Sequence, residues 1–153
     1  MAQTPPSALE AHLGYWLRLV SNHVSHAFLR KVEAAGVTVS EWVVLRALLP
    51  PDPATSPGAL VRSLGMTKGA VSKLIDRLAA RDLVVRAPSD DDRRQQHLTL
   101  TPRGRALVPR LARLADDNDR EFFGHLPREQ RDALLRAMQA LVAHHHLHGA
   151  PTD

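Results

Sequence analysis

The segment from Met66 to Thr101, MTKGAVSKLIDRLAARDLVVRAPSDDDRRQQHLTLT, constrains the fold more than any other. Its first part predicts a helix over residues 68–81, with apolar side chains at helical spacing on one face and polar and basic side chains on the other. Two β-prone segments follow, residues 83–85 and 97–101, and the run between them is too polar to be buried. A basic helix followed by a charged β-hairpin is the layout of a winged helix-turn-helix, so we expect the chain to bind duplex DNA.

The positive charge of the chain is concentrated on this segment. The net charge is +4 and the isoelectric point is near 10.3. Residues 67–105 hold nine Lys and Arg against five Asp, whereas the flanking segments are nearly neutral. A general preference for arginine raises the isoelectric point, but it does not explain why the excess lies on the predicted helix and hairpin. The distribution therefore favours a nucleic-acid partner.

Helical patterns extend on both sides of this segment. Leucine, valine and phenylalanine recur at spacings of three and four from residue 8 to about residue 35. Thr38 and Glu41 form a capping-box pattern, and Ser56-Pro57 and Thr101-Pro102 pair an N-cap residue with proline at the first helical position. A last helix is predicted from Pro127, with these side chains facing inward: Leu134, Leu135, Met138, Leu141 and Val142.

These patterns predict a mainly α, α+β winged-helix fold in a single domain of 153 residues. The DNA-binding region is expected at residues 37–101. The terminal helices, residues 8–35 and 102–146, carry more apolar surface than one monomer can bury. We therefore expect them to form a homodimer.

Several other classes of protein are not indicated. The chain has no cysteine and no apolar run of membrane-spanning length, and it begins without a basic segment leading into an apolar one. A cytoplasmic location is the simplest expectation. Phosphate-binding loops, nucleophile elbows and paired carboxylates are also missing, so we expect no enzymatic activity and no cofactor. His144 and His148 have a spacing that would suit a metal on a helix, but a solvated chain end is the favoured interpretation.

Three segments together resemble the MarR family of bacterial transcriptional regulators: residues 37–48 (VTVSEWVVLRAL), 66–86 and 91–104 (DDRRQQHLTLTPRG). The third is the most specific, because the family pairs an Asp-x-Arg at the hairpin tip with a short strand that ends in Leu-Thr. The chain departs from the family at Asp82, where glycine is usual. That position tends to need a left-handed backbone, which Asp tolerates better than most residues.

The resemblance places the DNA contacts on the predicted helix and on the hairpin tip. The expected DNA-binding residues are Thr67, Lys68, Ser72, Lys73, Arg77, Asp92, Arg93 and Arg94. Arg94 is expected in the minor groove, and Asp92 is expected to orient an arginine. The alternative roles are open at this stage: Thr67 as a helix cap only, Arg77 and Arg81 as a solvated face, and the tip as a solvated turn.

The family resemblance also implies a pocket for a small effector, often an aromatic acid, between the dimer helices and the winged helix. The candidate effector-binding residues are His12, Trp16, His23, Trp42 and Arg46. Arg46 would pair with a carboxylate while a tryptophan packs on a ring. The competing interpretation is that both tryptophans belong to the core and that His23 lies at the dimer interface.

Repression is the commoner mode of action in the family, so a ligand-responsive repressor that binds a pseudo-palindromic operator is the favoured function. Three alternatives stay open. An architectural DNA-binding protein would show little sequence preference, and a winged helix that binds protein would show no salt-dependent DNA binding. A metal-responsive repressor would release or bind its operator when a chelator is added.

Overall fold

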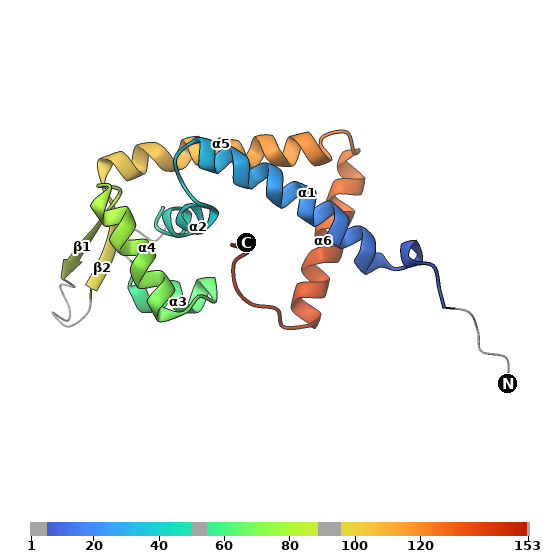
Figure 1. Cartoon of the computed structure of the whole chain (residues 1–153), viewed down its shortest axis with the longest axis horizontal. Coiled ribbons are helices and arrows are strands. Elements are labelled where there is room, and N and C mark those ends of the chain that lie inside the picture. The colour runs from blue at the N-terminus through green and yellow to red at the C-terminus, as the bar shows by residue number, and fades with distance from the viewer. Residues whose placement is uncertain (1–5, 50–54, 89–95, 153) are drawn as a thin grey trace.

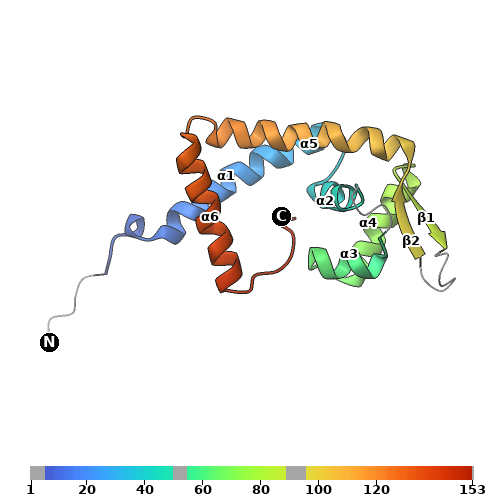
Figure 2. The same ribbon diagram turned by 180° about the vertical axis from the view of Figure 1, so that it is seen from behind.

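The computed structural model describes residues 6–49, 55–88 and 96–152. A short 3₁₀ helix precedes six α-helices and one two-stranded sheet: η1 (Leu9–Ala11), α1 (Leu13–Ala34), α2 (Val39–Ala47), α3 (Pro57–Leu64), α4 (Lys68–Ala80), β1 (Val84–Pro88), β2 (Gln96–Leu100), α5 (Pro102–Phe123) and α6 (Arg128–His144). Helices α1 and α5 lie side by side and form the top of an arch (Figure 1). The lobe of α2, α3, α4 and the sheet stands at one end, and α6 descends at the other (Figures 1 and 2). The predicted winged-helix fold is confirmed.

The helices of the lobe begin at the residues that the sequence predicts. The backbone N–H of Glu41 donates to Thr38 Oγ1 over 3.1 Å, and the N–H of Thr38 donates to Glu41 Oε2 over 3.0 Å, which completes the capping box. The side chains of Ser56, Thr67 and Thr101 accept hydrogen bonds in the same way from the third residue of α3, α4 and α5. Side-chain caps therefore fix where four of the helices start.

One apolar core holds the lobe together. The most deeply buried large side chains come from α2, α3, α4, β2 and α5, and they include Leu45, Leu60, Ile75, Leu78, Leu98 and Leu111. The predicted inner faces of α4 and β2 are confirmed, because Val71, Leu74 and Leu100 are buried as well. With its inner face in this core, α4 presents its polar face outward.

A tight joint connects α4, the predicted DNA recognition helix, to α5. Asp82 adopts a positive φ of 55°, as its place in the family pattern predicts, and its carbonyl accepts a 2.7 Å hydrogen bond from Thr101 Oγ1. A Cβ atom on Gly104 would lie 2.2 Å from the carbonyl oxygen of Leu83, so only glycine allows this approach. The strands pair antiparallel, with Val84 opposite Leu100. They differ slightly from the predicted segments, since β1 extends to Pro88 and Thr101 caps α5 instead of ending β2.

Two predictions about the terminal helices are corrected. The continuous helix predicted from residue 8 is interrupted at His12, which has an extended backbone between η1 and α1. At the other end, α6 stops at His144, and His146 has a positive φ of 51°. His144 and His148 are therefore not on one helix and lack the helical spacing that the sequence suggested.

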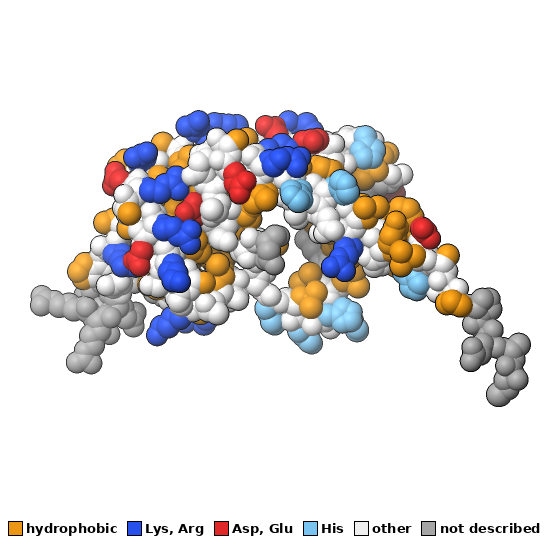
Figure 3. Space-filling model, viewed as in Figure 1, with side chains coloured by type: hydrophobic (Ala, Val, Ile, Leu, Met, Phe, Trp, Pro, Cys, Tyr) orange, Lys and Arg blue, Asp and Glu red, His pale blue; other side chains and the backbone are white. Residues whose placement is uncertain are grey.

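The apolar face of α6 is not inward within one chain. No residue of α6 is buried, and the predicted inner side chains Leu134, Leu135, Met138, Leu141 and Val142 are 38–56% exposed. The first half of α1 adds Leu13, Trp16, Leu17 and Val20, all at least 44% exposed. Hydrophobic side chains accordingly gather over the α1 and α6 end of the molecule (Figure 3). The prediction that the α6 side chains face inward is therefore wrong within one chain, because helical periodicity identifies an apolar face but not the surface that covers it.

Candidate DNA-binding surface and effector cavity

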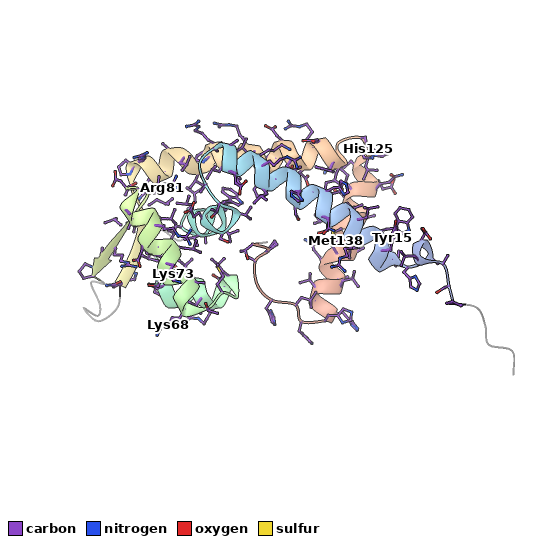
Figure 4. The ribbon with its side chains drawn as sticks, in the orientation of Figure 1. Tyr15, Lys68, Lys73, Arg81, His125 and Met138 are labelled. Carbon is purple, nitrogen blue, oxygen red and sulfur yellow. The ribbon has the colours of Figure 1, made fainter. Side chains whose placement is uncertain are left out.

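The outer face of α4 is polar, basic and open. Lys68, Ser72, Lys73 and Arg77 are exposed, and none of them forms an ion pair or a side-chain hydrogen bond with another described residue. Figure 4 labels Lys68 and Lys73 on this helix, and Figure 3 shows Lys and Arg side chains gathered over the lobe. Thr67 differs from the others, because its hydroxyl caps α4 by accepting from the N–H of Ala70 over 3.2 Å. The helix therefore presents unpaired positive charge from its first turn onward.

A groove separates the start of α4 from the hairpin. Its volume is about 430 Å³, and its lining includes Lys68, Ser72, Arg86 and Gln96. Arg86 of β1 donates to Asp76 of α4 over 2.6 Å, so strand and helix are linked by an exposed ion pair. Sequence reasoning did not select Arg86. The available signal was one arginine in a β-prone segment next to a basic helix, which does not reveal that α4 and β1 lie side by side.

Arg81 ends the recognition helix and has a structural role. Its guanidinium donates to Glu41 Oε2 over 3.2 Å and to the carbonyl oxygen of Gly36 over 2.6 Å. The side chain of Glu41 is only 5% exposed, whereas that of Arg81 is 41% exposed. The same carboxylate completes the capping box of α2, so one buried group connects the end of α4 to the turn between α1 and α2. Arg77 and Arg81 are both exposed, as the solvated-face interpretation requires, but Arg81 is in addition bonded to Glu41 and Gly36.

The expected contacts of the hairpin tip, Asp92, Arg93 and Arg94, lie outside the described residues. The strands that carry the tip are described up to Pro88 and from Gln96. The roles of these three residues remain predictions.

A cavity of about 860 Å³ lies where the arch meets the lobe. Its lining comes from α1, α2, α5 and the segment after α6: Ser21, Asn22, Val24, Ser25, His26, Phe28, Leu29, Val39, Trp42, Val43, Ala115, Asn118, Asp119 and Pro151. The rings of Phe28 and Trp42 meet edge to face, with centroids 6.4 Å apart. Aromatic and aliphatic walls with a few polar groups are typical of small-molecule sites.

Asn118 is the buried polar group of this cavity. Its Oδ1 accepts from Lys31 Nζ over 2.8 Å, and its Nδ2 donates to the carbonyl oxygen of Val24 over 3.2 Å. Lys31 also forms a 2.6 Å ion pair with Glu121. The amide of Asn118 is thus fixed in orientation and keeps one N–H for a further acceptor. His26 and Asp119 are the ionisable side chains among the described lining residues.

The structure separates the five residues predicted to bind an effector. Trp42 lines the cavity, and His23 lies in a neighbouring hollow with Arg30 and Phe122. The other three lie apart from it: His12 bonds to Ser7 and Leu9, Trp16 donates to the carbonyl of Glu10, and Arg46 is exposed in the last turn of α2. His26 and Asn118 were missed, since helical periodicity alone does not show which polar residues of α1 and α5 face α2.

Two further features concern the described part of the chain. It holds no group of three or more His, Cys, Asp or Glu side chains placed to bind a metal ion. His144 instead packs its ring edge to face on His145, with centroids 4.8 Å apart. No described helix combines the length and apolar character needed to cross a membrane.

Comparison with known proteins agrees with this geometry. Residues 35–95 match the model of the MarR family. The chain is 29% identical to a transcriptional repressor of Mycobacterium tuberculosis, over 86% of this chain and 94% of that protein. It is 34% identical to the transcriptional activatory protein BadR of Rhodopseudomonas palustris, over 68% of this chain and 61% of BadR. The chain belongs to the MarR family.

A solved structure extends the likeness to nearly the whole MarR-type chain. BpsR of Bordetella bronchiseptica superposes with a TM-score of 0.76 at 28% identity, covering 90% of this chain and 97% of that one. The similarity therefore includes α1, α5 and α6 as well as the lobe that the family model matches. Members of this family are DNA-binding regulators and not enzymes, which agrees with the lack of catalytic motifs in the sequence.

The joint at Arg81 generates a prediction about stability. Arg81→Met removes the partner of the buried Glu41 carboxylate and should lower the free energy of unfolding by about 1–3 kcal/mol, since a buried acceptor loses a charged donor. Arg77→Met is the matched control on the same helix and should change stability by less than about 0.5 kcal/mol, because Arg77 is exposed. Urea unfolding of both variants measures the difference. Equal stabilities would show that the Arg81–Glu41 pair does not hold the helix.

Proposed function

We propose that this MarR-type protein is a homodimeric transcriptional repressor that binds a pseudo-palindromic operator and releases it when a small aromatic molecule enters the cavity. The observation that carries the proposal is the open basic face of α4, whose Lys68 and Lys73 have no acidic partner among the described residues. This face lies beside the hairpin and is fixed from behind by the core and by Arg81. A helix held in this way can enter a major groove with its first turns leading.

The two kinds of DNA contact have different chemistry. Lys68 and Lys73 would reach phosphates or guanine edges in the major groove, and the small side chain of Ser72 would allow close approach. Arg94 at the hairpin tip would enter the adjacent minor groove, where a narrow A·T tract concentrates negative potential. The ion pair between Arg86 and Asp76 supports this arrangement, because it joins the hairpin to the helix at 2.6 Å.

The exposed apolar faces of α1 and α6 support the dimer. Large apolar side chains that are 38–88% exposed on two helices are unusual for a monomer, and a second copy is the simplest surface to cover them. We propose residues 8–35 and 102–146 as the dimerisation region and residues 37–101 as the DNA-binding region. The packing of α1 on α5 supports this division.

The cavity supports a small aromatic effector. The DNA binding of BpsR is regulated by 6-hydroxynicotinic acid. In this chain a flat ring would pack against Phe28 and Trp42, while His26 and the remaining N–H of Asn118 would donate to a hydroxyl or carboxylate group. His26 and Asn118 thereby take the polar role that the sequence suggested for Arg46.

His23 and Trp16 are proposed to serve the dimer interface. A regulator of this type would work in the cytoplasm.

Dimerisation can be tested on α6. Leu141→Asp should convert the dimer to monomer or unfold it, because it places an unpaired charge in the interface. Ala140→Asp introduces the same charge at the neighbouring position, away from the apolar face, and should leave the dimer intact. Sedimentation equilibrium should give about twice the 16.9 kDa chain mass for the parent and for Ala140→Asp. A stable monomeric parent would refute the dimer.

DNA recognition can be tested on the helix and on the tip. Arg94→Ala and Lys68→Ala should each weaken operator binding by about 1–3 kcal/mol. Little change in melting temperature is expected, because Lys68 is exposed and the sequence around Arg94 is too polar to be expected in a core. Arg110→Ala, on an exposed turn of α5, is a control that removes one positive charge. Fluorescence anisotropy with operator duplex measures the affinities. If Arg94→Ala binds the operator as tightly as the parent does, the tip is only a solvated loop. If the parent binds operator and random duplex with equal affinity, an architectural protein is favoured instead.

A further inference from the structure

The segment after α6 does not trail into solvent. It turns back beneath the arch and ends between α2, α3 and α6, as both ribbon views show (Figures 1 and 2). Ala150 packs against the core of the DNA-binding lobe, and Pro151 forms part of the cavity wall. Two adjacent residues of one short segment therefore touch the lobe and the cavity.

The contact with the lobe is a fitted backbone-to-backbone junction. The N–H of Ala150 donates to the carbonyl oxygen of Leu64 over 3.0 Å. This carbonyl belongs to the last turn of α3, where no intrahelical donor is available. A Cβ atom on Gly65 would lie 2.8 Å from Gly149 Cα, so the two segments approach this closely only because residue 65 is glycine. Gly65 and Gly149 also have positive φ values of 66° and 105°.

This junction lies directly before the recognition helix. Gly65 ends α3 in a left-handed conformation, and Thr67 caps α4 two residues later. The segment thus holds the turn of the helix-turn-helix from the side that faces the cavity. Lys68 and Ser72, which are proposed to contact DNA, follow this turn within two helical turns.

We propose that residues 149–152 are a strap that transmits occupancy of the cavity to the recognition helix. Pro151 lies against the cavity and Ala150 holds the carbonyl of Leu64, which fixes the turn before α4. A molecule that displaces Pro151 withdraws Ala150 from Leu64. The freed turn must then be ordered again when DNA binds, which lowers operator affinity. The inference rests on the proposed function and adds how a molecule in the cavity would control operator binding.

The absence of cysteine from the sequence gives a direct test that needs no known effector. Pro151→Cys carries a unique thiol in the cavity wall, and N-phenylmaleimide attaches an aromatic ring there. Alkylation should accelerate amide exchange in residues 60–67 and weaken operator binding at least about fivefold, the lower range of allosteric coupling. His148→Cys is the matched control, because it places the same ring on an exposed residue outside the cavity lining. Its alkylation should change both readouts less than about twofold.

A second pair of variants removes any dependence on the label. Gly149→Val forces a β-branched side chain onto a positive φ beside Leu64 and should release the strap, whereas His148→Val should not. Gly149→Val should show the same faster exchange and weaker operator binding as the alkylated protein. Unchanged exchange in residues 60–67, or faster exchange with parent-like operator affinity, would overturn the strap. A parent that binds no duplex selectively would refute the proposed function instead, and the exchange data would still decide whether the strap holds the turn.

Discussion

The geometry of the DNA-binding lobe depends on the hydrogen bonds that the carboxylate of Glu41 accepts. It is buried, and it receives hydrogen bonds from the Thr38 N–H and from the Arg81 guanidinium. Arg81 also reaches the carbonyl of Gly36. Because a buried charge without partners is costly, these bonds are made together or lost together. They join the end of the recognition helix to the place where α1 passes into α2. The angle of α4 to the arch is therefore set by polar bonds as well as by the apolar core.

A second joint follows directly after Arg81, at the same end of the recognition helix. The carbonyls of Asp82 and Leu83 meet the start of α5 at Thr101 and Gly104, with no room for a Cβ atom at Gly104. Helix α5 packs on α1, and both lead to the exposed apolar faces at the far end of the arch. The recognition helix is thus connected through short, rigid links to the surface proposed for dimerisation. In a dimer, these links would determine the distance between two recognition helices.

Local sequence signals predicted most of the fold. The cap residues Thr38, Ser56, Thr67 and Thr101 marked helix starts correctly, because capping depends only on residues three positions apart. Helical periodicity identified the buried face of α4 for the same reason. The family pattern added the positive φ of Asp82, which no periodicity reveals.

What the sequence could not show depends on contacts between distant residues. The Arg81–Glu41 pair spans 40 positions and the Lys31–Asn118 pair spans 87, and neither has a local signature. The cavity lining follows from the crossing of α1, α2 and α5, so only Trp42 of the five candidate effector residues was placed there. The face of α6 was predicted to be buried, but periodicity does not distinguish the core of one chain from the interface of two.

The spacing of DNA half-sites tests the central claim, that one rigid dimer presents two recognition helices to duplex DNA. Two half-sites about one helical turn apart should be bound together, whereas insertion of about half a turn moves one of them to the opposite face of the duplex. Anisotropy titrations at about 150 mM salt should show operator affinity falling at least about tenfold on that insertion. Affinity should stay low on insertion of a full turn, because that insertion restores the face of the duplex but moves the half-sites about 34 Å farther apart than a rigid dimer spans. Equal affinity for all three spacings would contradict the account.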